Sequence, residues 1–234
     1  MSCLFNGAGV TVMANSDCVE MARNLAERIF LGTDLACFTA GTRIETEVGL
    51  VAVEDLRDGM LVETMDNGLQ PLRRVLCKRV AGIGSLAPVV IEAGVFGNAR
   101  ALRLSPHHRM VVSGWRAELL TGEPEVLAAA GDLVDGQRVR REEAAEVDYF
   151  HLLFDRHEII FAEGAATESY HPFSGAGDLS AATRREIVTI FRDLAPTHAP
   201  DLMAAGDLPF WEGTLMGATA RPCARPEEAA LMLA

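Results

Sequence analysis

Hydrophobic and polar positions alternate over short runs through most of the chain between residues 37 and 164. One run places Ile44, Thr46 and Val48 on a common face before Gly49. Another leads into Asp-Asn-Gly at 66–68, which is a strong signal for a hairpin turn. Runs with a period of two, closely spaced and separated by turn residues, are typical of an all-β domain. We therefore predict all-β structure for this stretch.

The two flanking segments carry helical spacing instead. Capping residues at 15–17 precede apolar positions that recur about every third or fourth residue, which predicts one amphipathic helix ending near Gly32. A second helix is expected at 181–194, and Pro196 and Pro200 would stop it. The chain thus divides into a leader at 1–36, an all-β domain at 37–172 and a partly ordered helical extension at 173–234.

Composition narrows the possible partners and compartments. Acidic residues outnumber basic ones by 33 to 21, and the net charge of −12 argues against a nucleic-acid or anionic-membrane partner. No apolar run approaches the roughly 18 residues of a membrane span, and no signal peptide is evident. The five cysteines are scattered and form no Cys-x-x-Cys pair, which favours reduced thiols. We expect a soluble, cytoplasmic protein.

Candidate chemistry centres on Cys37, which stands where the leader gives way to the β domain. Two later stretches, Leu-Ser-Pro-His-His at 104–108 and Phe-Asp-Arg-His-Glu at 154–158, supply groups that such a thiol would need. A free thiol has a pKa of about 8.5, so only a few per cent is ionised at neutral pH without a neighbouring base. Together the three stretches form a nucleophile and base set.

These stretches, taken in order, resemble a known family. Cys-Phe-Thr-Ala-Gly-Thr at 37–42, Val-Glu-Asp-Leu at 53–56 and Asp-Asn-Gly at 66–68 resemble the opening of a Hint domain, the module shared by hedgehog autoprocessing domains and inteins. Ser105-x-x-His108 is similar to the Thr/Ser-x-x-His motif of that family, and residues 149–164 are similar to its Tyr…Asp-x-His…Gly block. The later block, with Glu-Ser at 168–169, also resembles a bacterial branch of the family. The resemblance covers about residues 36–172.

The resemblance implies a Hint fold, a compact disc of two related β halves, and a reaction of the chain with itself. Cys37 would attack the carbonyl of Ala36 and move the acyl group from nitrogen to sulfur. His108 would then give a proton to the departing amide nitrogen, and Ser105 would orient that proton transfer. Asp155 and His157 would assist by moving protons and polarising the carbonyl. The substrate is the N-terminal segment of the chain, and neither cofactor nor metal is implied.

Two departures from the family pattern decide whether splicing, sterol transfer or simple cleavage is expected. Inteins end on His-Asn, whereas this chain reads Ala-Thr-Glu-Ser-Tyr at 166–170, so full splicing is not expected. Hedgehog domains carry an aspartate that activates cholesterol, and the nearest stretch here, Leu-Cys-Lys-Arg at 76–79, has no acidic residue. Water or a small thiol or amine is therefore the expected acyl acceptor. The prediction is single-turnover self-cleavage between Ala36 and Cys37.

Several alternatives remain open at this point. The domain could be an inactive Hint scaffold that serves as a binding or assembly module, or a cysteine hydrolase that acts on other molecules. Cys37 could also be a small buried hydrophobe. Zinc could be bound by Cys37, His108 and His157, although their spacing carries no zinc-site signature. His151 is expected to be structural.

Overall fold

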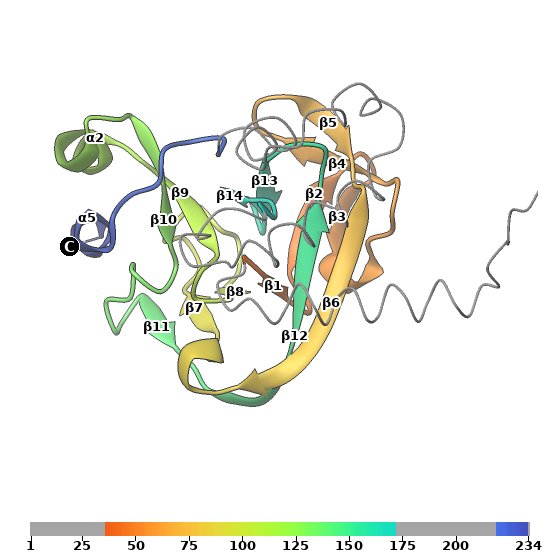
Figure 1. Ribbon diagram of the computed structural model, residues 1–234, viewed down its shortest axis with the longest axis horizontal. Coiled ribbons are helices and arrows are strands. Elements are labelled where there is room, and N and C mark those ends of the chain that lie inside the picture. Colours follow the sequence, from red (N-terminus) through yellow and green to blue (C-terminus); the bar gives the residue numbers. More distant parts are fainter. Residues whose placement is uncertain (1–35, 172–218, 234) are drawn as a thin grey trace, which may run out of the picture.

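The computed structural model describes residues 36–171 and 219–233 (Figure 1). The two helices expected at 15–32 and 181–194 lie outside these residues. The described elements are β1 (Phe38–Thr39), β2 (Arg43–Thr46), β3 (Gly49–Ala52), β4 (Leu61–Thr64), β5 (Gly68–Pro71), β6 (Arg74–Gly82), β7 (Val89–Ile91), β8 (Leu102–Leu104), β9 (Arg109–Ser113), α2 (Trp115–Thr121), β10 (Glu125–Ala129), β11 (Val139–Arg141), β12 (Ala144–Leu153), β13 (Ile159–Ala162), β14 (Ala165–Glu168) and α5 (Pro226–Met232), with short 3₁₀ turns at Val53–Asp55 and Gly84–Leu86.

The strands form two antiparallel sheets. One runs in the order β11-β7-β8-β1-β12-β6, and the other in the order β10-β9-β14-β13-β2-β4-β5, with β3 paired to β2. The two-residue strand β1 lies inside the first sheet, where Phe38 pairs with Leu104 of β8 and with Phe150 of β12. In Figure 1 the long strands β6 and β12 curve together along one side of the molecule. The start of the predicted β domain is thus held between two neighbouring strands.

The alternating pattern corresponds to burial along most strands. In β2, Ile44 and Thr46 are buried while their neighbours are partly exposed. The predicted hairpin is confirmed, because β4 and β5 pair with Thr64 opposite Gly68. Val48 differs from the expectation and is 73% exposed. The reason is that β2 ends at Thr46, so Val48 lies in the turn toward β3 rather than on the buried face.

The stretch at 117–139 lies inside the region predicted to be all-β but mixes structure types. It contains most of the short helix α2, the strand β10 and the start of β11. The last described segment packs against this region. Ala224 donates a backbone hydrogen bond to Leu127 of β10, and the buried residues Ala229 and Met232 of α5 belong to the main hydrophobic core. Residues 219–233 are therefore part of the domain's packing, as the proximity of α5 to α2 and β10 in Figure 1 shows.

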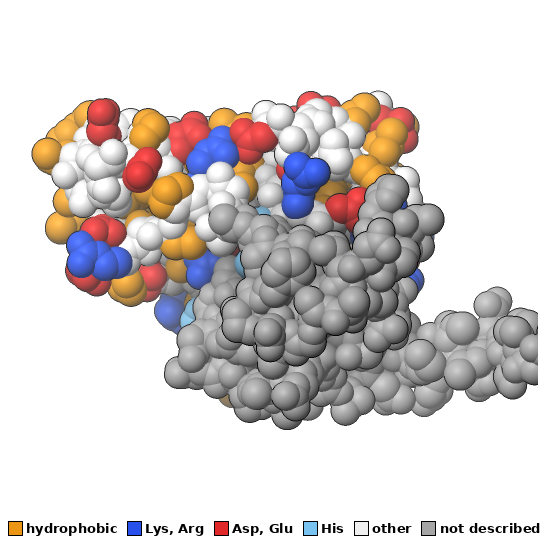
Figure 2. Space-filling view, turned by 45° about the horizontal axis from the view of Figure 1, so that its top comes forward, with side chains coloured by type: hydrophobic (Ala, Val, Ile, Leu, Met, Phe, Trp, Pro, Cys, Tyr) orange, Lys and Arg blue, Asp and Glu red, His pale blue; other side chains and the backbone are white. Residues whose placement is uncertain are grey.

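The described surface mixes charge types. Figure 2 shows acidic and basic side chains interspersed with apolar ones on the visible described face, without a continuous basic patch there. Among helices in residues 36–171 and 219–233, none has the length and apolar character needed to cross a membrane.

Candidate functional site

Cys37 is fixed by a pair of reciprocal hydrogen bonds at the edge of β1. Its backbone N–H donates to Ser105 Oγ at 2.9 Å, and the Ser105 N–H donates to the Cys37 carbonyl at 2.9 Å. This arrangement follows from the pairing of Phe38 with Leu104, which brings the next residue of β8 beside the residue that precedes Phe38. The sequence-predicted Ser105 therefore touches the nitrogen of the Ala36–Cys37 peptide bond.

His151 of β12 occupies the other side of the same peptide. Its Nδ1 lies 2.6 Å from the Ala36 carbonyl oxygen, and its Nε2 lies 3.4 Å from Cys37 Sγ. A carbonyl oxygen can only accept, so the hydrogen bonds assign the imidazole proton to Nδ1. Nε2 is then an acceptor that faces the thiol. One imidazole thus contacts both atoms that would react.

Burial keeps both partners neutral. It raises the pKa of the Cys37 thiol far above its usual range, and a hydrogen bond from Ser105 works in the opposite direction. Burial also lowers the pKa of His151 to about 3, although the hydrogen bond to the Ala36 carbonyl acts to raise it. Cys37 is 3% exposed. At neutral pH the site therefore holds a protonated thiol beside a neutral imidazole, whose Nε2 faces the sulfur as a hydrogen-bond acceptor.

His108 lies beside this pair and is completely buried. Its ring packs edge-on against the ring of Phe38 with 4.4 Å between centroids, and its Nε2 contacts Thr167 Oγ1. Burial lowers the pKa of His108 to about 4. Its Nδ1 has no hydrogen-bond partner among the residues that the structure describes. His108 is thus a second neutral imidazole in the site, and its Nδ1 is unpartnered within residues 36–171 and 219–233.

The structure gives the other two predicted site residues different partners. Asp155 is an exposed side chain that pairs with Arg73, with 2.9 Å between Arg73 Nε and Asp155 Oδ1. His157 is buried, with Nε2 3.2 Å from Glu168 Oε2, and its Nδ1 accepts the Ala220 N–H at 2.9 Å. Within the described contacts neither side chain reaches Ala36 or Cys37. His157 instead anchors the last segment of the fold.

Sequence reasoning overlooked His151, which we expected to be structural. Because side chains alternate along a strand, His151 and Leu152 lie on opposite faces of β12. Knowing the face of the sheet does not reveal which residue His151 contacts. The partner is set by the pairing of Phe38 with Phe150, which brings Cys37 and His151 together one position further along. The signal available in the sequence was a histidine inside the otherwise apolar run Tyr-Phe-His-Leu-Leu-Phe at 149–154, and the structure buries positions 149–153 of this run.

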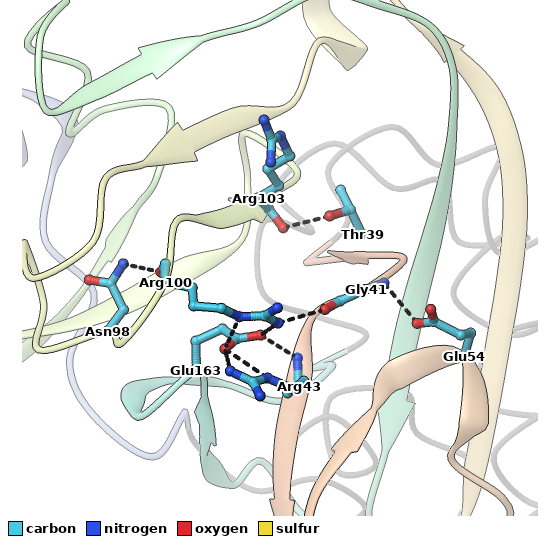
Figure 3. Close-up of polar contacts among 8 residues, drawn as sticks. All are labelled: Thr39, Gly41, Arg43, Glu54, Asn98, Arg100, Arg103 and Glu163. Atoms are coloured by element: carbon cyan, nitrogen blue, oxygen red, sulfur yellow. Dashed lines mark hydrogen bonds and ion pairs between the residues drawn. The ribbon is translucent and has the colours of Figure 1, made fainter.

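A cavity of about 290 Å³ adjoins the loop that follows β1. Figure 3 shows the Glu163 carboxylate beneath this loop, with the guanidinium groups of Arg43 and Arg100 directed at it. Arg100 also donates to the Gly41 carbonyl at 3.2 Å, and the Gly41 N–H donates to Glu54 at 2.8 Å. This network holds in place the loop that directly follows β1.

Glu163 is charged despite being only 2% exposed. Burial by itself would raise its pKa, but hydrogen bonds from Arg100 and Arg43 outweigh that effect and hold the pKa at about 2. Its φ of 53° lies in the left-handed region that a glutamate rarely adopts. Across residues 36–171 and 219–233, no cluster of three or more His, Cys, Asp or Glu side chains is arranged to hold a metal ion.

A buried cysteine opens this antiparallel β domain, with a serine hydrogen-bonded to its backbone and a histidine between its thiol and the preceding carbonyl. The family model of the Hint domain matches residues 36–174, and the chain belongs to that family. This match supports a general autoprocessing-type fold. Its fold is the Hint fold, as the resemblance predicted. Comparison with curated proteins gives no match.

Solved structures of similar fold are inteins and an intein-like domain. A bacterial intein-like domain from Clostridium thermocellum is 17% identical, with 57% of this chain and 97% of that chain covered and a TM-score of 0.40. The TvoVMA intein is 14% identical, with coverages of 57% and 96% and a TM-score of 0.41. A DnaB intein from Synechocystis is 13% identical, with coverages of 57% and 98% and a TM-score of 0.38.

Proposed function

We propose that this chain cleaves its own backbone between Ala36 and Cys37 through an N-to-S acyl shift. The observation that carries the proposal is the position of His151, which hydrogen-bonds the Ala36 carbonyl oxygen and the Cys37 sulfur at the same time. Base and oxyanion donor are thus combined in one side chain. The burial of Cys37 also favours a substrate within the chain over an added ester or peptide.

In the first step the sulfur attacks the carbonyl carbon. The thiol proton passes to His151 Nε2, a new bond forms between Cys37 Sγ and the carbon of Ala36, and the carbonyl oxygen becomes an oxyanion. The Nδ1–H that already donates to this oxygen stabilises the developing charge. The imidazole becomes cationic as the oxygen becomes anionic, so the two charges compensate each other in a buried site.

In the second step the carbon–nitrogen bond breaks. The oxyanion returns to a carbonyl, the nitrogen of Cys37 leaves with the bonding pair, and it takes up one proton. Ser105 Oγ lies 2.9 Å from that nitrogen, so its hydroxyl can deliver the proton and recover one from the imidazolium. The products are a thioester at Cys37 and a free amine on the same residue, and the net proton transfer is from sulfur to nitrogen.

The acyl acceptor then releases the segment that ends at Ala36. The stretch at 166–170 lacks the asparagine that inteins use, and residues 76–79 lack an acidic group, so splicing and sterol transfer are not part of the proposal. Water, a small thiol or a small amine attacks the thioester carbon, the carbon–sulfur bond breaks, and the sulfur regains its proton. Asp155 and His157 are left out of these steps because their described contacts lie with Arg73, Glu168 and Ala220.

Intact-mass spectrometry of freshly purified chain tests the proposal. Incubation at neutral pH with hydroxylamine or dithiothreitol should give fragments that comprise residues 1–36 and 37–234. Cys37→Ala should abolish both fragments, whereas Cys77→Ala, at an exposed cysteine, serves as the matched control and should cleave like the unmodified chain. Cleavage that persists in Cys37→Ala would refute the thioester route.

A second candidate is a Hint scaffold that binds a partner without turning over. It is favoured by the neutral state of the site, because the raised pKa of the Cys37 thiol makes its ionised form costly. A single unbroken mass under every condition above would support this alternative and overturn self-cleavage.

A further inference from the structure

The extended segment at residues 219–225 docks on the domain as an added strand. It meets β10, the last strand of the second sheet, where the Leu127 N–H donates to the Pro222 carbonyl at 2.8 Å and the Ala224 N–H donates to the Leu127 carbonyl at 2.9 Å. The two chains run parallel here, with Cys223 opposite Leu127. Addition of an extended segment to a sheet edge is a common way for proteins to bind peptides. The edge of β10 is thus a peptide-binding surface that a distant part of the same chain occupies.

Arg221 gives this docking its specificity. Its guanidinium donates to both oxygens of the Asp66 carboxylate, at 2.9 and 2.8 Å, and its Nε donates to Glu125 at 2.7 Å. Asp66 lies in the turn between β4 and β5, and Glu125 begins β10, so one side chain joins the segment to two parts of the sheet. The hydrogen bonds between them lower the pKa of Asp66 and raise the pKa of Arg221, so both groups keep their charges. The surface therefore fits an extended segment with an arginine, as in Ala-Arg-Pro at 220–222.

The docked segment also reaches a buried histidine. The Ala220 N–H donates to His157 Nδ1 at 2.9 Å, so the proton of that imidazole lies on Nε2, which is 3.2 Å from Glu168 Oε2. A second proton cannot enter at Nδ1 while Ala220 donates there. His157 therefore stays neutral and directs its N–H at Glu168 as long as the segment is docked.

Glu168 links this histidine to the turn that carries Ser105. Its Oε1 accepts the Arg109 N–H at 2.8 Å. The preceding residue, His108, closes the turn with a hydrogen bond from its N–H to the Ser105 carbonyl at 3.1 Å. At the start of the turn, Ser105 exchanges two backbone hydrogen bonds with Cys37. A series of contacts between buried groups therefore connects the docked segment with the peptide bond that would be cut.

We propose that docking of residues 219–225 activates the acyl shift at Cys37, which rests on the proposed function. An undocked segment would leave His157 Nδ1 without this donor, so the imidazole could change tautomer or take a second proton. In either state its contact with Glu168 changes, and with it the support of the turn at 105–108. The chain would then cut itself only after a segment far along its sequence has folded onto the domain. The segment lies outside the residues 36–174 that match the Hint family model, so this control is separate from the family's chemistry.

A proline at position 220 tests the contact with His157, because proline has no N–H to donate. Hydroxylamine captures the thioester rapidly, so the rate of hydroxylamine-dependent cleavage reports the acyl shift. Ala220→Pro should lower this rate about 3- to 30-fold, the range for changes that weaken coupling between two sites. Arg221→Gln, which weakens docking at another point, should lower it within the same range. Ala220→Gly keeps the N–H and should cleave near the unmodified rate, as should Leu231→Ala at an exposed position of α5.

Unmodified rates in folded Ala220→Pro and Arg221→Gln chains would overturn the proposal. Faster cleavage in either variant would make the docked segment an inhibitor and would overturn it as well. Thermal unfolding of each variant identifies a loss of rate that comes from misfolding. If the proline variant does not fold, Arg221→Gln still decides the question, because it alters a side chain and leaves the backbone unchanged.

A second measurement does not depend on cleavage. Amide hydrogen exchange on the full chain carrying Cys37→Ala should become faster at 105–110 as well as at 219–225 when Ala220→Pro is added, and should stay unchanged in β6, which takes no part in these contacts. Faster exchange at 219–225 alone would refute the link between the segment and the turn. If hydroxylamine never cleaves the unmodified chain, the proposed function fails, whereas the exchange rates still decide whether docking of the segment reaches the turn beside Cys37.

Discussion

Substitutions at His151 separate its two contacts. Asparagine is shorter than histidine, but its amide nitrogen can take the place of Nδ1 and donate to the Ala36 carbonyl, and nothing then replaces Nε2 opposite Cys37. Phenylalanine keeps a ring in the buried site and removes both contacts. His151→Asn therefore tests the base alone, and His151→Phe tests the base together with the oxyanion donor.

The expected magnitudes follow from the two roles. Loss of a positioned general base lowers a rate by roughly 100- to 10,000-fold. Loss of one preformed oxyanion donor costs about 100- to 1,000-fold more, or about 2.7–4 kcal/mol of transition-state stabilisation. The thioester-forming rate should thus decrease in the order unmodified chain, His151→Asn, His151→Phe.

The assay is the rate of hydroxylamine-dependent cleavage, followed by intact mass. His107→Phe, at an exposed histidine, is the matched control and should cleave at the unmodified rate. Thermal unfolding should show that each variant is folded. A folded His151→Phe chain that cleaves as fast as the control would refute the reasoning, and equal rates for the asparagine and phenylalanine variants would exclude the oxyanion contact.

Three further predictions concern stability. Burial lowers the pKa of His108 to about 4, so the folded state resists a proton that the unfolded chain accepts near pH 6.5. The free energy of unfolding should therefore fall by about 3 kcal/mol for this residue as the pH drops from about 6.5 to about 4. Urea unfolding across that range checks this prediction, and an equally steep fall in a His108→Gln chain would contradict it. Glu163→Gln should lower the free energy of unfolding by roughly 2–4 kcal/mol, because it leaves Arg43 and Arg100 without their buried partner. Glu54→Gln, at an exposed position, should lower it little. Equal losses in denaturant unfolding would argue against the network. Met232→Ala should lower the free energy of unfolding by about 2–4 kcal/mol, because the side chain is buried in the core. Leu231→Ala, at an exposed position, should change it by no more than about 0.5 kcal/mol. A Met232 variant as stable as the Leu231 variant in denaturant unfolding would show that α5 contributes no packing energy.

The sequence specified the fold through local signals. Period-two burial in β2, the turn at 66–68 and the cysteine at the edge of the first strand all follow from neighbouring residues. Ser105 was found by its motif, and the structure places its hydroxyl on the nitrogen of Cys37. Where a signal is local, residue types and spacing were sufficient.

The remaining features depend on long-range register. The pairing of Phe38 with Phe150 decides that His151 meets Cys37, and no pattern within either strand encodes that pairing. His157 carries a family motif, yet its contacts depend on Glu168 and on Ala220, which lies 63 positions further along the chain. The packing of α5 similarly depends on α2 and β10, which contribute surfaces that its own residues do not reveal.

The position of β1 between β8 and β12 has a consequence for the cut protein. Strand ends at the margin of a sheet can fray. The new terminus produced at Cys37 would instead stay next to β1, which is hydrogen-bonded to β8 on one side and to β12 on the other. The newly formed amine of Cys37 would lie in the buried interior of the domain, where an ammonium charge is disfavoured. We therefore expect the amine to stay neutral and nucleophilic beside the thioester, so that the acyl group can return to nitrogen until an outside acceptor removes it. Thioester formation would then be a reversible equilibrium, and the cut would be completed only when an outside acceptor takes the acyl group.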